Sequence, residues 1–378
     1  MNIIGVVAEY NPFHNGHKYQ LDKIKETFKD SLVIICTSSS FTQRGNISVL
    51  NKWEKTKIAL ENGADIVVEL PYIYSTQSSD IFAEYALKIL NELKINYLVF
   101  GSESNNLDDI ITNAKIQLFN DNFDKKVKIY MDSGINYPTA LNNALKDLNG
   151  STINKPNDLL ALSYIKEILK NNYNIKPYNI KRTNDFHDIT SNEKIVSASN
   201  IRNKIYEGKD YKNQVPNNVY EILKNKQINN KYFEYIKYKI ITDNNLNRYL
   251  DVDEGLSIRI KNVINKSNTI NELIKNIKTK RYTYNKISRM LNHILCSFTV
   301  YEKDIINDLE YIRILGFSTK GKEYLNQIKK ELKTPILNKY DTKKYKTLEI
   351  EKRVTNVYSL IFDDIDEQEI KNKPIITK

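Results

Sequence analysis

The stretch MNIIGVVAEYNPFHNGHKYQL, residues 1–21, decides the fold. Residues 2–8 (NIIGVVA) are β-rich and almost uninterrupted in apolar character, the pattern of a strand covered on both faces. A short polar turn, His14-Asn15-Gly16-His17, follows, and residues 18–28 then carry apolar side chains at helical spacing. The chain therefore opens with a buried strand, a turn and a helix.

The alternation of strand and helix continues beyond this stretch. The predicted strands are residues 31–37 (SLVIICT), 65–70 (DIVVEL), 96–101 (NYLVFG) and 175–181 (IKPYNIK), and the predicted helices between them are residues 51–62, 79–93 and 157–170. Strands and helices that alternate at this spacing form right-handed βαβ units around a parallel sheet. In such a sheet, ligands bind in a crevice at the carboxyl ends of the strands.

The pattern changes near residue 206. Beyond it strand signals fade, and residues 254–276, 284–298 and 322–332 have helical periodicity. The length of 378 residues also favours two domains. We therefore predict an α/β, Rossmann-like parallel-sheet domain over residues 1–205 and an all-helical domain over residues 206–378.

Cysteine usage and hydropathy restrict the location of the protein. Cys36 and Cys296 lie far apart and form no metal-ligand spacing, and the N-terminal stretch lacks the layout of a secretory signal. The longest apolar runs, such as residues 3–8 and 32–36, are far shorter than the roughly 20 residues that span a bilayer. We therefore expect a reduced, cytoplasmic protein that does not enter a membrane.

The positive charge is concentrated in the second part of the chain. Residues 1–205 contain 24 Lys and Arg against 23 Asp and Glu, whereas residues 206–378 contain 33 against 23. A basic surface of this kind suits a polyanion such as RNA. Lysines scattered over solvated helix faces would give the same count, so charge alone leaves both interpretations open.

The polar turn after the first strand has the residues of a phosphate-binding site. A helix N-terminus presents free N–H groups and a positive dipole end, and Gly16 allows close approach of a nucleotide to the backbone. The imidazoles of His14 and His17 can donate hydrogen bonds where charge accumulates on a triphosphate, so we predict both as catalytic. An ordinary polar turn, or half of a metal site, is the alternative. No cysteine or carboxylate lies at ligand spacing, and we predict no bound metal.

Residues 197–202 (SASNIR) predict a second phosphate-binding helix start. Serine hydroxyls and helix N–H groups can bind phosphate while Arg202 forms a fork onto its oxygens, and Ser199 is the second predicted contact. By itself this pattern also describes an ordinary helix cap beside a surface arginine. Its occurrence together with the upstream His-x-Gly-His turn favours the phosphate interpretation.

Together these two motifs resemble the nucleotidyltransferase superfamily, which is related to class I aminoacyl-tRNA synthetases. Within it the sequence is most similar to the tRNA(Met) cytidine acetate ligase family. The blocks that carry the resemblance run in order along the chain: residues 5–21, 38–45 (SSSFTQRG), 61–71 (ENGADIVVELP), 99–103 (VFGSE), 156–166 (PNDLLALSYIK), 175–182 (IKPYNIKR), 186–188 (FHD), 197–202, 254–260 (EGLSIRI) and 280–295 (KRYTYNKISRMLNHIL). The chain departs from the family pattern at Asn46-Ile47 and at Lys55, where the family usually has Glu-Pro and Arg.

The resemblance implies a two-step reaction. ATP and acetate form an enzyme-bound acetyl-adenylate, and the acetyl group passes to N4 of the wobble cytidine of elongator tRNA(Met). Mg²⁺ is expected to travel with the triphosphate. The ATP contacts implied by the family are Val7, Ala8, Glu9, Tyr10, Asn11, Pro12, Phe13, His14, Asn15, Gly16, His17, Lys18, Tyr19, Gln20, Gly101, Asn157 and Arg182.

Several residues are candidates for RNA contact. Gln43 and Arg44 follow the second strand, at the mouth of the expected crevice, where they can read or stack a flipped-out cytidine. A surface turn with a capping arginine is the alternative. In the second domain the basic candidates for phosphate contact are Lys280, Arg281, Lys286 and Arg289, whereas His293 is predicted to be structural. Glu9 and Glu103, at strand ends, are either reactive carboxylates or structural groups, that is, caps or salt-bridge partners.

Two other functions remain open from the residues. A small-molecule nucleotidyltransferase would also use the His-x-Gly-His turn, but it would give the basic second half no purpose. A non-catalytic RNA-binding protein could keep the nucleotide fold, and the complete turn argues against this. We expect acetate and elongator tRNA(Met) as partners and no stable protein partner.

Overall fold

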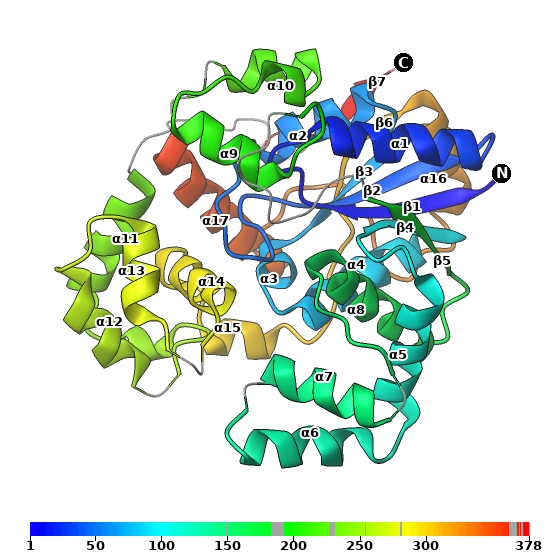
Figure 1. Cartoon of the computed structure of the whole chain (residues 1–378). Helices are drawn as coiled ribbons and strands as arrows, with labels where there is room; N and C mark the ends of the chain where they lie inside the picture. Colours follow the sequence, from blue (N-terminus) through cyan, green and yellow to red (C-terminus); the bar gives the residue numbers. More distant parts are fainter. Residues whose placement is uncertain are drawn as a thin grey trace.

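The computed structural model describes residues 1–135, 137–148, 150–182, 193–224, 226, 231–253, 255–279, 282–362, 369, 371 and 373–377. At its centre lies a seven-stranded sheet with the strand order β5-β4-β1-β2-β3-β6-β7 (Figure 1). The strands are β1 (Ile3–Ala8), β2 (Leu32–Ser38), β3 (Ile66–Leu70), β4 (Tyr97–Ser102), β5 (Lys176–Lys181), β6 (Ile314–Ser318) and β7 (Ile375–Thr377). β1 to β5 run parallel, and β6 pairs antiparallel with β3. The parallel α/β fold predicted from the sequence is therefore confirmed.

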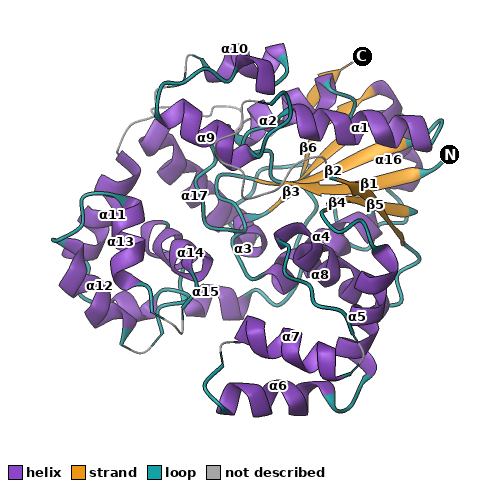
Figure 2. Cartoon of the chain, in the orientation of Figure 1, coloured by secondary structure: helices purple, strands orange, loops and turns teal. Residues whose placement is uncertain are grey.

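The helices cover both faces of the sheet and form a further group beside it (Figure 2). Those of the first half are α1 (Asn15–Thr27), α2 (Lys52–Glu61), α3 (Tyr72–Ser75), α4 (Ser79–Glu92), α5 (Leu107–Phe119), α6 (Phe123–Asp132), α7 (Tyr137–Asp147), α8 (Pro156–Lys170) and α9 (Ala198–Tyr206). They are followed by α10 (Asn217–Leu223), α11 (Lys231–Thr242), α12 (Leu256–Ile264), α13 (Ile270–Ile277), α14 (Tyr284–Leu295), α15 (Val300–Ile305), α16 (Thr319–Ile328) and α17 (Lys346–Phe362).

Alternate residues of the apolar strands enter two different cores. On β2, Leu32 and Ile34 pack on the side of α4 and α8, whereas Val33 and Ile35 pack on the side of α1 and α2. Each face of the sheet therefore needs apolar residues, which is why the strands read as continuous apolar runs. Among the described residues, no helix is long and apolar enough to cross a membrane.

The second half differs from the all-helical expectation in two short strands. β6 and β7 extend the sheet beyond β3, so residues after 206 contribute to the same core as β1 to β5. β6 contains Gly316, where a Cβ atom would lie 2.6 Å from Thr56 Cγ2 of α2. The glycine permits close packing of strand on helix but interrupts the β-rich pattern that would reveal a strand. The helix expected over residues 254–276 is two helices, because Thr269 caps a new start at α13.

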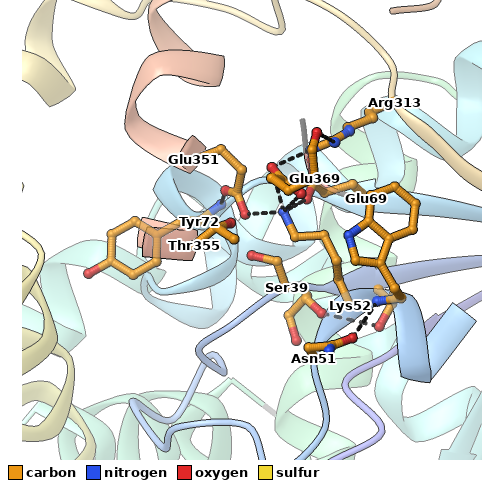
Figure 3. Close-up of polar contacts among 12 residues, drawn as sticks. Ser39, Asn51, Lys52, Glu69, Tyr72, Arg313, Glu351, Thr355 and Glu369 are labelled. Carbon is orange, nitrogen blue, oxygen red and sulfur yellow. Dashed lines mark hydrogen bonds and ion pairs between the residues drawn. The ribbon is translucent and has the colours of Figure 1, made fainter. Parts of the chain in front are cut away.

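A buried charge cluster joins the C-terminal part to the sheet (Figure 3). Lys52 Nζ lies 2.5 Å from Glu69 Oε1 on β3 and 3.0 Å from Glu351 Oε1 on α17. Arg313, just before β6, donates to Glu369 Oε1 at 2.7 Å, and Glu369 also lies 3.2 Å from Lys52 Nζ. These five side chains are almost completely buried. Residues beyond about 335, which carry no sequence motif, thus complete the interior beside β3.

Candidate active site

The predicted crevice exists at the carboxyl ends of the parallel strands. A cavity of about 580 Å³ opens there between the β1–α1 turn, the loop after β2, the end of β4, the start of α8 and the start of α9. Of the predicted ATP contacts, those that line it are Val7, Ala8, Glu9, Tyr10, Asn11, His14, His17, Gln20, Gly101, Asn157, Arg182, Ser199 and Arg202. Its size falls in the range of about 300–1,000 Å³ that is usual for small-molecule sites.

The remaining predicted contacts lie beside this cavity. Gly16 and Tyr19 line a smaller adjoining pocket with Gly101 and Arg182. Phe13 is fully buried in the core, and neither it nor Pro12, Asn15 or Lys18 lines either space. Asn15 Nδ2 instead donates to the carbonyl oxygens of Lys194 and Asn213. These four residues therefore shape or anchor the turn, and their nucleotide contacts stay predictions.

The two histidines cap helix α1 reciprocally. The N–H of Gly16 donates to His14 Nδ1 at 3.0 Å, and the N–H of His14 donates to His17 Nδ1 at 3.2 Å. The imidazole rings stack with their centroids 3.8 Å apart. This arrangement satisfies N–H groups that would otherwise be free at the helix start. It also fixes the orientation of both rings toward the cavity.

Both histidines are held neutral with a defined tautomer. Burial, with the charges of Arg182 and Arg202, lowers the pKa of His14 to about 3, and burial, His14 and Arg182 lower the pKa of His17 well below its ordinary value. A neutral imidazole whose Nδ1 accepts a hydrogen bond must carry its proton on Nε2. Each ring therefore presents an N–H donor, which matches the predicted role toward phosphate oxygens.

Arginines surround the cavity and make it electropositive. Arg202 donates to the carbonyl oxygen of Asn11 at 2.6 Å and to Ser199 Oγ at 3.0 Å. Arg182 follows β5 and packs over Gly101, where a Cβ atom would lie 3.2 Å from Arg182 Cγ. Its Nε is buried without a hydrogen-bond partner in the described structure. A buried guanidinium nitrogen without a partner is costly, so an anionic ligand oxygen at this point is expected.

The two candidate carboxylates have different environments. Glu103 accepts hydrogen bonds from the backbone of Asn157 and Asp158 and from Asn157 Nδ2, and so caps the start of α8. Glu9 Oε1 accepts the N–H of Gln43 at 2.6 Å and lines the cavity. Burial raises the pKa of Glu9, an effect opposed by the Gln43 hydrogen bond and Arg44. Glu103 thus has the capping role that was the alternative prediction, whereas Glu9 faces the ligand space.

The loop after β2 is fixed from both sides. Lys55 on α2 is fully buried, and its Nζ donates to the carbonyl oxygens of Ser38 and Ser39. On the other side Ser288 and Asn292 of α14 both donate to the carbonyl oxygen of Gly45, at 2.9 and 2.7 Å. Lys55 therefore stabilises the loop through its hydrogen bonds and does not contact phosphate. This structural role explains why lysine is accepted at a position where the family usually has arginine.

The predicted RNA-contact residues occupy different places. Gln43 and Arg44 line the cavity, as the sequence predicted. Arg289 is only 9% exposed and donates to the carbonyl oxygen of Gln43, a position that argues against its predicted phosphate contact. Lys286 is half-exposed and pairs with Asp253 at 2.6 Å.

The remaining predicted residues are His293 on α14 and the basic pair Lys280-Arg281, which precedes that helix. His293 is buried against the Tyr72 hydroxyl, which confirms its structural role. Lys280 and Arg281 lie outside the described residues.

The apolar wall of the cavity was not among the features predicted from the sequence. Phe82 of α4, Phe100 of β4, and Leu160 and Tyr164 of α8 also line the cavity. Phe82 has only the periodicity of a core position, whereas Phe100, Leu160 and Tyr164 lie in the family-like blocks 99–103 and 156–166. Within those blocks no pattern distinguishes a cavity-lining apolar residue from an ordinary packing residue. The cavity thus combines a cationic, hydrogen-bonding side with an apolar side.

Comparison with known proteins places this arrangement in a family. A model of the HIGH Nucleotidyl Transferase family matches residues 1–373. The tRNA(Met) cytidine acetate ligase of Caldicellulosiruptor saccharolyticus is 36% identical over 99% of this chain and 98% of that protein, and that of Clostridium tetani is 37% identical over the full length of both. The chain belongs to the tRNA(Met) cytidine acetate ligase family.

Solved structures of this family share the whole architecture. Apo Thermotoga maritima TmcAL matches with a TM-score of 0.89 and 27% identity, and the same protein bound with alpha-thio ATP matches with a TM-score of 0.86 and 28% identity. Both matches cover 100% of this chain and 99% of the other. The tRNA(Met) cytidine acetate ligase fold therefore includes the helices and strands after residue 206 as well as the nucleotide-binding half.

Proposed function

We propose that this protein activates acetate with ATP and transfers the acetyl group to N4 of the wobble cytidine of elongator tRNA(Met). The observation that carries the proposal is the pair of neutral, Nε2-protonated histidines at a helix start, in a chain that matches tRNA(Met) cytidine acetate ligases over its full length. We also propose the cytoplasm as its location and the predicted division of labour, with residues 1–205 catalytic and residues 206–378 holding the tRNA.

In the first step an acetate oxygen attacks the α-phosphorus of ATP. The bond to the β-phosphate breaks, pyrophosphate leaves, and acetyl-adenylate remains. The step needs in-line positioning and stabilisation of charge on phosphate oxygens, without a covalent enzyme intermediate. His14 and His17 supply neutral donors, and Arg182 and Arg202 supply positive charge. Among the described residues, no cluster of three or more His, Cys, Asp or Glu side chains could bind a metal ion. We propose that Mg²⁺ enters bound to the triphosphate.

In the second step N4 of the cytidine attacks the acyl carbon. The bond between the acyl carbon and the phosphate oxygen breaks, and AMP leaves with its electron pair. N4 loses one proton, so that N4-acetylcytidine forms. Gln43 and Arg44 lie on the loop after β2 at this cavity, and we propose that they orient the flipped base. Glu9 accepts the Gln43 N–H, so the carboxylate couples the position of that loop to the nucleotide side.

The test uses labelled acetate with ATP, in the presence and absence of tRNA. Label in acid-precipitable tRNA, together with acetate-dependent exchange of pyrophosphate into ATP, is the expected result. Transfer of AMP to a small molecule without acetate would instead identify a small-molecule nucleotidyltransferase. If neither acetate-dependent exchange nor labelled tRNA forms under conditions where the purified protein is folded, the proposed function is wrong.

A further inference from the structure

A second cavity adjoins the nucleotide cavity on the side of the C-terminal helices. It has a volume of about 590 Å³ and lies between the loop after β2, α9, α11, α13, α14 and α17. Asn46, Ser199 and Arg202 line both cavities, so the two spaces meet at the position where the predicted phosphate-binding arginine lies. Figure 1 shows these helices grouped beside the nucleotide-binding half.

The walls of this second cavity differ in chemistry from those of the first. Tyr206, Tyr232, Phe233, Tyr284 and Phe362 supply aromatic rings from four different helices. Asn46, Asn203 and Asn271 add amide groups, and Arg202 at the junction is basic. The lining also includes the acidic Glu207, whose carboxylate is paired with Lys209 at 2.6 Å. Aromatic faces with interspersed amides suit unpaired nucleobases, which stack on rings and use their edges for hydrogen bonds.

Two of the rings are open to solvent in the free protein. Tyr206 at the end of α9 is 53% exposed, and Tyr284 at the start of α14 is 37% exposed. The Tyr284 hydroxyl donates to Asn271 Oδ1 at 2.7 Å, which fixes the ring between α13 and α14. An exposed ring held in one orientation loses little entropy when a base stacks on it. Tyr284 therefore has the properties of a stacking platform, and Tyr206 offers a second exposed ring in the lining of the same cavity.

The cavity is also linked mechanically to the loop that holds Gln43 and Arg44. The hydroxyl of Tyr232 donates to Asn292 Oδ1, and Asn292 Nδ2 donates to the carbonyl oxygen of Gly45. The wall and the loop thus share one hydrogen-bonded support. A base bound in the second cavity would lie on a surface fixed relative to the base bound in the first.

We propose that the second cavity binds the unpaired nucleobases next to the acceptor cytidine, stacked on Tyr206 and Tyr284, while the cytidine itself passes Arg202 into the nucleotide cavity. This inference rests on the proposed function for the identity of the RNA. It assigns to Tyr206 and Tyr284 a role in RNA binding that the activation step does not need.

The test compares Tyr206→Leu and Tyr284→Leu with the parent protein. The probe is an RNA hairpin with the sequence of the anticodon stem–loop of elongator tRNA(Met), carrying 2-aminopurine beside the wobble cytidine. Loss of one stacking contact is worth about 1–3 kcal/mol, so each change should weaken hairpin binding by about 5- to 160-fold. The fluorescence decrease that accompanies stacking should shrink, whereas acetate-dependent pyrophosphate exchange, which needs no RNA, should persist.

Matched variants separate stacking from general damage. Tyr206→Phe and Tyr284→Phe keep the ring face and should bind the hairpin within about threefold of the parent. Tyr238→Leu removes an equally large ring that is 68% exposed on α11 and lines neither cavity, and it should bind like the parent. Unchanged hairpin affinity in both Tyr206→Leu and Tyr284→Leu would overturn the proposal.

The binding test is independent of acetyl transfer. If the parent protein binds the hairpin through these tyrosines but forms no acetylated tRNA, the second cavity stands as an RNA site and the proposed function fails. If acetylated tRNA forms at the parental rate in the double variant Tyr206→Leu/Tyr284→Leu, the proposed function stands and the second cavity does not bind the acceptor loop.

Discussion

Lys52 Nζ lies 3.0 Å from Glu351 Oε1, and this buried ion pair joins two residues 299 positions apart. Glu351 also accepts the N–H of Tyr72 at 2.7 Å through its second oxygen. Figure 3 shows how the pair continues through Glu69 to Arg313. The C-terminal helix α17 is therefore connected to the first half of the sheet by charged groups from which water is excluded.

Removal of the central cation should cost much of the folding free energy. Lys52→Met leaves three buried carboxylates with Arg313 alone, and breaking such a buried pair costs about 3–5 kcal/mol. The measurement is the free energy of unfolding in urea. Lys57→Met, on the same helix α2, is the control, because Lys57 and Glu61 form an exposed pair at 4.0 Å. That change should cost about 0–1 kcal/mol. Equal losses in the two variants would contradict the assigned importance of the cluster.

The same cluster predicts a pH dependence that one substitution removes. Burial, with Glu351 and Glu369 nearby and in spite of Lys52 and Arg313, raises the pKa of Glu69 from 4.5 to about 7. The folded state therefore binds a proton that the unfolded state releases, so this contribution to stability is complete below pH 4.5 and is lost as the pH rises through 7.

Glu69→Gln mimics the protonated form and does not titrate. Between pH 4.5 and 7, the stability of the parent relative to Glu69→Gln should fall by about 1.4 kcal/mol per pH unit. Urea unfolding of both proteins across this range gives the difference directly. A difference that is constant from pH 4.5 to 7 would mean that Glu69 keeps its ordinary pKa in the folded protein.

The histidine assignment can be tested without loss of the helix cap. In His14→Asn, the asparagine oxygen can still accept the N–H of Gly16, because asparagine is among the best N-cap residues, but the Nε2–H donor is gone. We expect the free energy of unfolding to change by less than about 1 kcal/mol. The kcat of acetate-dependent pyrophosphate exchange should fall about 10²- to 10³-fold, as for loss of one donor to a developing charge.

His14→Gln gives the reverse test at the same position. Its longer side chain can place an amide N–H near the former Nε2 but caps the helix less well. It should therefore retain more exchange activity than His14→Asn while being less stable. Parental exchange rates in both His14→Asn and His17→Ala would show that the imidazoles do not stabilise the reaction.

The sequence was sufficient for the features that depend on local pattern. Continuous apolar runs revealed β1 to β4, whereas β5 was predicted from a mixed stretch with Pro177 and lies at the edge of the sheet. The position of His14 and His17 after the first run revealed the nucleotide cavity. The short strands β6 and β7 were missed because a five-residue strand with a central glycine and a three-residue strand show little periodicity. Pairs such as Lys52 with Glu351 leave no local signal at all.

Helix α14 illustrates why the buried side of a helix cannot be predicted from apolar periodicity alone. Its apolar residues Ile287 and Leu291 are buried, and its basic residues Lys286 and Arg289 were predicted to contact RNA phosphate. Instead Ser288, Arg289 and Asn292 are buried against the loop after β2. Backbone carbonyl oxygens in a buried loop need donors, so a polar helix face can be interior when it faces such a loop.

Gly45 provides the last test, because it is the point where this helix and the loop meet. Its φ is +80°, and a Cβ atom there would lie 2.5 Å from the backbone nitrogen of Arg289. Gly45→Ala must therefore displace either the loop or α14, and both movements would shift Gln43 and Arg44 away from the nucleotide cavity. Transfer of acetyl groups to tRNA should fall more than acetate-dependent pyrophosphate exchange, since the histidines belong to a different turn.

Gly134→Ala is the matched control for backbone strain. Gly134 has a similar φ of +87°, but a Cβ atom there would meet nothing within 4 Å. That variant should lose only about 1 kcal/mol of folding free energy, the usual cost of a left-handed conformation for a residue with a side chain, and it should transfer acetyl groups at the parental rate. Gly45→Ala should lose more in both measurements because it adds a steric clash to the same strain. If the two variants behaved alike, contact between Gly45 and α14 would have no part in positioning the loop.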